Sequence, residues 1–219
     1  MAQTFLEMQK AVGRELNMEI TDTSPVTLEQ VKADLNAGRQ IVFNHLLNLN
    51  QKYGVRKVKA DLVANQSIYT FPHDFVKLLR LEVGYKSETE RHKAEEINYM
   101  ETQHYKYASE VSPCYEIIGD MLQIYPTPDE SIENGLYMTY IENPEPMEDD
   151  NDISNLPFPN YDYLIVLYAT AKGKNTLGLM AEGNNFMAQF NNGLVEMATT
   201  VIDRNEDGGG HVVNLDRYY

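Results

Sequence analysis

The sequence contains a single cysteine, Cys114, in 219 residues. One thiol cannot form an internal disulfide, and it is too few for a cysteine-based zinc site. Cys114 is expected inside a strand, where a structural thiol is more common than a reactive one. The scarcity of cysteine therefore favours a protein made in a reducing cytoplasm.

Long apolar runs are also missing. No stretch approaches the roughly 18 apolar residues that a membrane-spanning helix needs. The first ten residues, MAQTFLEMQK, carry acidic and polar groups where a signal peptide requires an apolar segment. We therefore expect no membrane association.

Motifs for catalysis are absent as well. The five histidines show no H-x-x-x-H spacing, and the sequence has no G-x-S-x-G elbow and no P-loop. Glu116 can be paired with Glu110 or Asp120 for a hydrolytic mechanism, but nothing in the sequence singles out such a pair. We expect a protein without enzymatic activity or cofactor. A small carboxylate-based hydrolase remains an alternative.

One acidic segment, residues 142–152, reads ENPEPMEDDND and holds six carboxylates. Asp149, Asp150 and Asp152 offer oxygen ligands of the kind that a hard cation prefers. The segment lacks the turn glycine and the distal bidentate glutamate of an EF-hand. We therefore favour a solvated acidic linker over a metal site.

Positive charge is scarce and unevenly distributed. The net charge is -15, which disfavours a nucleic-acid-binding surface based on phosphate contacts. Residues 52–93 contain nine Lys or Arg against five Asp or Glu, whereas residues 107–171 contain no Lys or Arg against thirteen Asp or Glu. The acidic stretch is either a solvated surface or one end of a charge axis in subunits that stack on differently charged neighbours.

The clearest local structure is a hairpin in residues 113–128, PCYEIIGDMLQIYPTP. Gly119 at the first central position suits a type II′ turn. That turn pairs Ile118 with Met121, Ile117 with Leu122 and Tyr115 with Ile124. Strict alternation then places Tyr115, Ile117, Leu122 and Ile124 on one face that buries well.

Helical periodicity occurs on both sides of this region. Apolar spacing predicts helices over residues 4–16, 28–53, 161–171 and 181–202, with a T-L-E-Q capping box at Thr27 and a break or bend at Gly173. Strands are expected near residues 58–62, 66–72, 77–85 and 136–141, and one further helix over residues 94–107.

We therefore predict an α+β fold. A helical bundle is formed by the N- and C-terminal helices, residues 1–55 and 156–203. An antiparallel β-rich region, residues 56–155, is inserted with one helix and the acidic linker. Residues 204–219 form an extended C-terminal arm.

The C-terminal residues carry the strongest functional signal. Three glycines, Gly208 to Gly210, precede an apolar and aromatic end. A disordered end is one interpretation. An arm that docks on another subunit accounts for both the hinge and the side chains. The candidate partner-binding residues are Val212, Val213, Leu215, Tyr218 and Tyr219.

Several short motifs occur in an order that resembles the head-to-tail adaptor (connector) proteins of tailed bacteriophages. They are Tyr69-Thr70-Phe71-Pro72, the Pro113-x-Tyr115 hairpin with its Gly119-Asp120 turn, Tyr125-Pro126-x-Pro128, and Leu156-Pro157 with Tyr161. The resemblance spans most of residues 27–202. Members of that family often carry a tryptophan near the end of the second helix, and this chain has none.

The resemblance implies a structural virion protein of the neck, made in the host cytoplasm. It implies a homo-oligomeric ring, usually dodecameric, that binds the portal protein above and tail or nozzle proteins below. Genomic DNA would pass through the channel without specific binding. A stopper or terminator ring elsewhere in the neck or tail and a monomeric cytoplasmic binding module are the alternatives.

Overall fold

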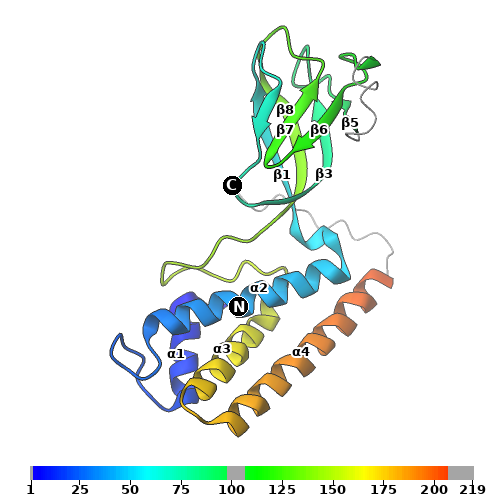
Figure 1. The fold of residues 1–219 in the computed structure, drawn as a ribbon. Helices are drawn as coiled ribbons and strands as arrows, with labels where there is room; N and C mark the ends of the chain where they lie inside the picture. The colour runs from blue at the N-terminus through cyan, green and yellow to red at the C-terminus, as the bar shows by residue number, and fades with distance from the viewer. Residues whose placement is uncertain (1, 98–106, 207–219) are drawn as a thin grey trace. The chain divides into compact units, whose positions relative to one another are not determined.

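The computed structural model describes residues 2–97 and 107–206, and they form an α+β fold, as predicted (Figure 1). The chain divides into two compact units. The helical unit contains Met1–Tyr53 and Pro146–Tyr219, and the β unit contains Gly54–Glu145. The β unit is thus a single stretch of chain placed between the two halves of the helical unit.

The helical unit contains four α-helices, α1 (Phe5–Leu16), α2 (Leu28–Leu49), α3 (Asp162–Thr176) and α4 (Met180–Glu206), in the part of the chain that the structure describes. Short 3-10 helices, η1 (Gln51–Gly54) and η3 (Pro159–Tyr161), follow α2 and precede α3. Thr4 caps α1 in a reciprocal box with Glu7. At α2 only half of the predicted box forms: Thr27 accepts from the backbone N–H of Gln30, whose side chain instead donates to Thr176.

Helix α3 packs against each of the other three helices. Two glycines permit close approach. A Cβ on Gly38 would lie 3.1 Å from Tyr168, and one on Gly173 would lie 2.8 Å from a methyl of Leu16. The predicted break at Gly173 is therefore wrong: α3 continues through it to Thr176, because the missing side chain makes room for Leu16. Helix α4 likewise runs past the predicted end at Ile202.

Buried polar groups join the two halves of the helical unit. The Arg39 Nε–H on α2 donates to the Ser154 carbonyl at 2.5 Å. The Ser154 hydroxyl donates to the Asp162 carboxylate, which also accepts from the Gln3 backbone N–H. Burial raises the pKa of Asp162, and the hydrogen bonds from Ser154 and Gln3 oppose that rise. Residues far apart in sequence are held in one network.

The described residues of the β unit form two four-stranded sheets. The first has the order β1-β8-β3-β4 and the second has the order β2-β7-β6-β5. The strands are β1 (Val55–Leu62), β2 (Ile68–Thr70), β3 (Phe75–Val83), β4 (His92–Lys93), β5 (Glu95–Glu96), β6 (Cys114–Ile118), β7 (Met121–Tyr125) and β8 (Ile132–Glu142). Their inner faces share one hydrophobic core.

The hairpin prediction is confirmed in register. Ile118 lies opposite Met121, Ile117 opposite Leu122 and Tyr115 opposite Ile124. Gly119 has φ +64°, as the first central position of a type II′ turn requires. Tyr115, Leu122 and Ile124 are buried, whereas Ile117 is exposed.

The predicted helix over residues 94–107 is wrong at its start. Glu95 and Glu96 form β5, which pairs in parallel with Cys114 and Tyr115 of β6. Ala94 and Ile97 are buried beside this strand, so their apolar character reflects sheet packing rather than a helical face. Residues 98–106, with Met100 and His104, lie outside the described residues.

A second buried polar cluster lies at one end of the β1-β8-β3-β4 sheet and links β1, β8 and the residue before β3. Asp74 is buried, and its carboxylate accepts from Tyr140 on β8 at 2.9 Å and from Arg56 on β1 at 2.6 Å. Arg56 also reaches Glu142 at 3.1 Å. Burial and the bond to Asp74 raise the pKa of the Tyr140 hydroxyl. This cluster lies near the points where the chain enters and leaves the β unit.

Candidate interaction surfaces

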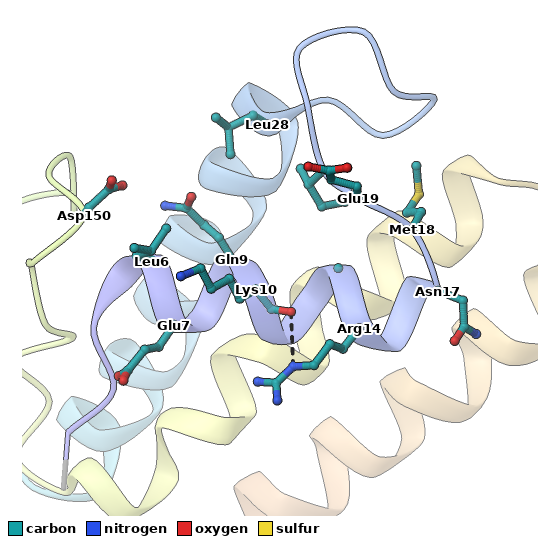
Figure 2. Close-up of a pocket in the computed structure, with 12 residues that line it drawn as sticks. Leu6, Glu7, Gln9, Lys10, Arg14, Asn17, Met18, Glu19, Leu28 and Asp150 are labelled. Atoms are coloured by element: carbon teal, nitrogen blue, oxygen red, sulfur yellow. Dashed lines mark hydrogen bonds between the residues drawn. The ribbon is translucent and has the colours of Figure 1, made fainter.

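An open groove runs along α1 in the helical unit (Figure 2). It measures about 970 Å³ and lies between α1 and the segment that returns toward α2. Met18 and Glu19 lie on that segment, and Leu28 lies at the start of α2 (Figure 2). Gly13 lets the segment approach, since a Cβ there would lie 3.1 Å from the Met18 carbonyl oxygen. The groove therefore owes its shape to the short α1 and the loop that follows it.

The groove combines apolar side chains with both signs of charge. Lys10 and Arg14 lie on α1, where the Arg14 Nε–H donates to the Lys10 carbonyl at 3.4 Å (Figure 2). Gln9 is buried, and its amide nitrogen has no hydrogen-bond partner among the described residues. The lining has no dominant charge that would identify a ligand class.

The acidic segment is a well-defined loop that is anchored on the helical unit. Met147 is buried, and its backbone N–H and carbonyl bond both ends of the Asn36 side-chain amide on α2. Asp152 accepts from the backbone N–H groups of Glu148 and Asp149. These two bonds hold the pKa of the Asp152 carboxyl below its usual range. These hydrogen bonds fix the backbone of the loop.

The rest of this loop lines a hollow that also contains Lys32. Glu148, Asp149 and Asp150 are exposed. They form no ion pair with any residue that the structure describes. Within residues 2–97 and 107–206, no group of three or more His, Cys, Asp or Glu side chains is placed to hold a metal ion. We name Glu148, Asp149 and Asp150 the acidic loop.

The outer face of the β1-β8-β3-β4 sheet is basic. Strand register places Lys57 and Arg80 on either side of Thr139, and Lys59 and Glu82 on either side of Tyr137. The outward residues of this face include five basic side chains and the acidic side chains of Asp61 and Glu82, and the basic ones are Lys57, Lys59, Lys77, Arg80 and Lys93. We name this surface the basic face.

Two irregularities in β3 shape the basic face. The register of β3 against β8 shifts between Phe75 and Lys77 and again between Leu78 and Arg80. Each shift inserts an extra residue, Val76 and Leu79, so that the inward positions are three residues apart rather than two. Val76 and Leu79 are 54% and 39% exposed. Apolar side chains therefore lie among the lysines.

Some cations of the basic face are already paired. Lys59 lies 2.5 Å from Glu88, and Arg80 contacts Glu82. Arg91 stacks over the Tyr137 ring at 4.6 Å. Lys57, Lys77 and Lys93 are exposed and form no ion pair with the described part of the chain. These three lysines are the ones free to meet a partner.

The residues considered for hydrolysis lie elsewhere. Glu110 lies 3.8 Å from Lys86, Asp120 lies in the hairpin turn, and Glu116 lies on β6 opposite Gln123. Cys114 is half-buried on β6, and burial raises the pKa of its thiol, with a further contribution from Glu95. A thiol of this kind is less reactive than an exposed one.

The predicted docking residues Val212, Val213, Leu215, Tyr218 and Tyr219 lie outside the described residues, so they remain a prediction. None of the described helices is both long and apolar enough to cross a membrane. The strands expected near residues 58–62 and 77–85 cover part of the basic face, but its basic character was not predicted. The missed signal is the three-residue spacing of Lys77 and Arg80, which indicates bulges within a strand.

The family model of the SU10 adaptor protein matches residues 3–213, which is nearly the whole chain. The chain belongs to the SU10 adaptor protein family. It is a structural phage adaptor protein and a component of the virion, and the family resemblance in its sequence is confirmed. No curated protein matches the chain.

Proposed function

We propose that this adaptor assembles as a homo-oligomeric, dodecameric ring below the portal and links the capsid to the tail or nozzle proteins. Genomic DNA passes through the ring, and the protein acts without catalysis. The observation that carries the proposal is the family match over residues 3–213. It spans both units, so the assignment does not rest on one motif.

The charge of the chain supports a passive channel. A net charge of -15 repels a polyanion at close range. Contacts with phosphates would instead release counterions and hold the DNA. A wall that does not bind phosphate lets DNA slide during packaging and ejection.

We further propose that the C-terminal residues dock on the portal or on a neighbouring subunit. Val212, Val213, Leu215, Tyr218 and Tyr219 supply apolar and aromatic contacts, and Gly208–Gly210 supply the hinge. Tyrosine is among the residue types that contribute most of the binding energy in many interfaces.

The first experiment is co-sedimentation with the portal protein encoded in the same genome, followed by electron microscopy of the complex. A ring stacked on the portal is the expected result, and its symmetry can be counted directly. No association over a range of salt concentrations would contradict the portal assignment. That result would favour a stopper or terminator ring further along the neck or tail.

A second experiment tests the tail. One variant replaces the five docking residues with serine and keeps the length of the chain. A matched control replaces the polar neighbours Asn214 and Asp216 with serine. We expect the first variant to lose portal binding and the control to retain it, with equal far-UV circular dichroism. Equal binding by both variants would contradict the docking proposal.

A further inference from the structure

Two described surfaces of this chain carry opposite charge and lie in different units. The basic face belongs to the β unit, and the acidic loop belongs to the helical unit. The three unpaired lysines of one surface and the three unpaired carboxylates of the other have no ionic partner in the described part of their own chain. Both surfaces are therefore available to a partner.

We propose that the basic face of one copy docks on the acidic loop of a second copy, so that these two surfaces form the contact between neighbouring subunits. The inference deepens the ring assembly proposed above and rests on it. It assigns the contact to Lys57, Lys77 and Lys93 on one side and to Glu148, Asp149 and Asp150 on the other.

The symmetry of a ring requires two different patches. A head-to-tail contact closes a ring when patch A of each copy meets patch B of the next. Copies with a net charge of -15 repel one another unless complementary patches face each other. The basic face and the acidic loop supply one such pair on each copy.

The composition of the basic face favours a protein partner over DNA. Val76 and Leu79 are exposed among the lysines, as expected for an interface with an apolar centre and a charged rim. Glu82 and Glu88 lie on or beside the same face and pair with Arg80 and Lys59. These ion pairs reduce the number of cations on the face that are free to contact phosphates.

The backbone of the acidic loop is preorganised for such a contact. It is fixed by Asp152 and by the two bonds between Met147 and Asn36. A fixed loop loses little conformational freedom on binding, so less of the interaction energy is spent on ordering it. Exposed carboxylates on an ordered loop present a stable pattern of negative charge.

The test uses three double variants of the full chain. The face variant is Lys57→Glu with Lys77→Glu, and the loop variant is Asp149→Lys with Asp150→Lys. The matched control is Lys52→Glu with Lys172→Glu, which changes two exposed lysines that belong to neither surface by the same charge. All substituted side chains are exposed, so circular dichroism should show unchanged folds.

Self-association is measured by sedimentation velocity at low and high salt. We expect wild type and control to associate at low salt and to dissociate near 1 M salt, where the Debye length falls to about 3 Å. On its own, each of the face and loop variants should show an association constant at least about tenfold below that of the wild type. An equal mixture of the two should recover association, because the reversed surface of each meets the reversed surface of the other.

Carbodiimide coupling of ¹⁴N- and ¹⁵N-labelled copies locates the contact. Mixed-isotope cross-links that join Lys57, Lys77 or Lys93 to the acidic loop are expected. Cross-links within one isotope only, a mixture that fails to recover, or a wild type without self-association at any salt would each overturn the proposal. So would a face variant that assembles normally but loses affinity for duplex DNA, a result that assigns the face to DNA.

Portal co-sedimentation of the wild type separates this proposal from the proposed function. If the wild type forms a ring on the portal and both variants also assemble normally, the adaptor function is supported and the contact between the basic face and the acidic loop is contradicted. If the wild type self-associates through the two surfaces but never binds the portal, the contact is supported and the proposed binding to the portal is contradicted.

Discussion

The two units of this adaptor are assembled from the chain in opposite ways. The helical unit joins its two ends, Met1–Tyr53 and Pro146–Tyr219, whereas the β unit uses one uninterrupted stretch, Gly54–Glu145. Polar ties in the helical unit span 115 residues between Arg39 and Ser154 and 159 residues between Gln3 and Asp162. The β unit closes with pairings inside its own stretch. Only the β unit therefore holds all the partners of its core in one segment.

Separate fragments give the largest expected effect. A fragment of residues 54–145 should fold alone, because its core is self-contained and its ends meet where Val55 pairs with Ile141. A fragment of residues 1–53 should stay unfolded, because α1 and α2 lose the α3 side chains that complete their core. Circular dichroism and amide-proton dispersion measure both. A folded 1–53 fragment would contradict the conclusion that the core of the helical unit needs both of its chain segments.

Core truncation gives the next largest effect and locates it in one unit. Ile165→Ala on α3 and Leu81→Ala on β3 each remove a fully buried side chain. Each should lower the free energy of unfolding of its own unit by about 2–5 kcal/mol. Chemical denaturation followed by hydrogen exchange assigns the loss. Equal losses of protection in both units for both variants would show that the two units unfold as one.

The buried polar ties should matter less than the cores. Arg39→Ala removes the donor to Ser154 in the helical unit, and Tyr140→Phe removes the donor to Asp74 in the β unit. Each leaves a buried acceptor without that partner, at a cost of about 1–3 kcal/mol. The exposed control Arg14→Ala should cost under about 0.5 kcal/mol. If Arg39→Ala and Tyr140→Phe had the same denaturant midpoint as Arg14→Ala, these hydrogen bonds would not stabilise the protein.

A smaller effect is expected at the hairpin turn. Gly119→Ala places a side chain at φ +64° with no neighbouring atom within 4 Å, so only backbone strain opposes it. The cost should be about 1–2 kcal/mol, and Gly119→Asn should recover much of it. The loss should be confined to the β unit in hydrogen exchange. Equal stability of the alanine and glycine forms would contradict the turn assignment.

The smallest effect concerns alkaline pH. Burial, aided by Glu96, raises the pKa of Tyr115 to about 12. Between the ordinary tyrosine pKa near 10 and this value, the folded β unit retains a proton that the unfolded chain releases. Stability therefore falls as the pH rises through this window. Tyr115→Phe should reduce that slope, as measured by denaturation at several pH values. An unchanged slope would contradict the assignment.

Sequence reasoning succeeded where one local signal determines the structure. Gly119 determined the turn, and the turn determined the register of β6 and β7. Thr27 marked the start of α2. Such features depend on a few neighbouring residues, so tertiary packing leaves them unchanged.

It failed where distant contacts decide the outcome. Gly173 continues α3 because Leu16 of α1 occupies the space beside it. Glu95 and Glu96 form a strand because β6 offers a partner. The bulges at Val76 and Leu79 depend on the register of β8, so the composition of the basic face was only partly visible in the sequence.

The place where the chain enters and leaves the β unit has a mechanical consequence. Val55 and Ile141 are paired in antiparallel neighbouring strands, so both connections leave from the same end of one sheet. A pull on these two connections would separate the β1–β8 ladder one residue pair at a time, starting at Val55 and Ile141. The Asn36–Met147 and Arg39–Ser154 hydrogen bonds join the two halves of the helical unit. A force that pulls these two halves apart therefore acts on those bonds before it acts on the β unit. The helical unit thus protects the β unit from mechanical force, and the β unit bears the force only after those hydrogen bonds break.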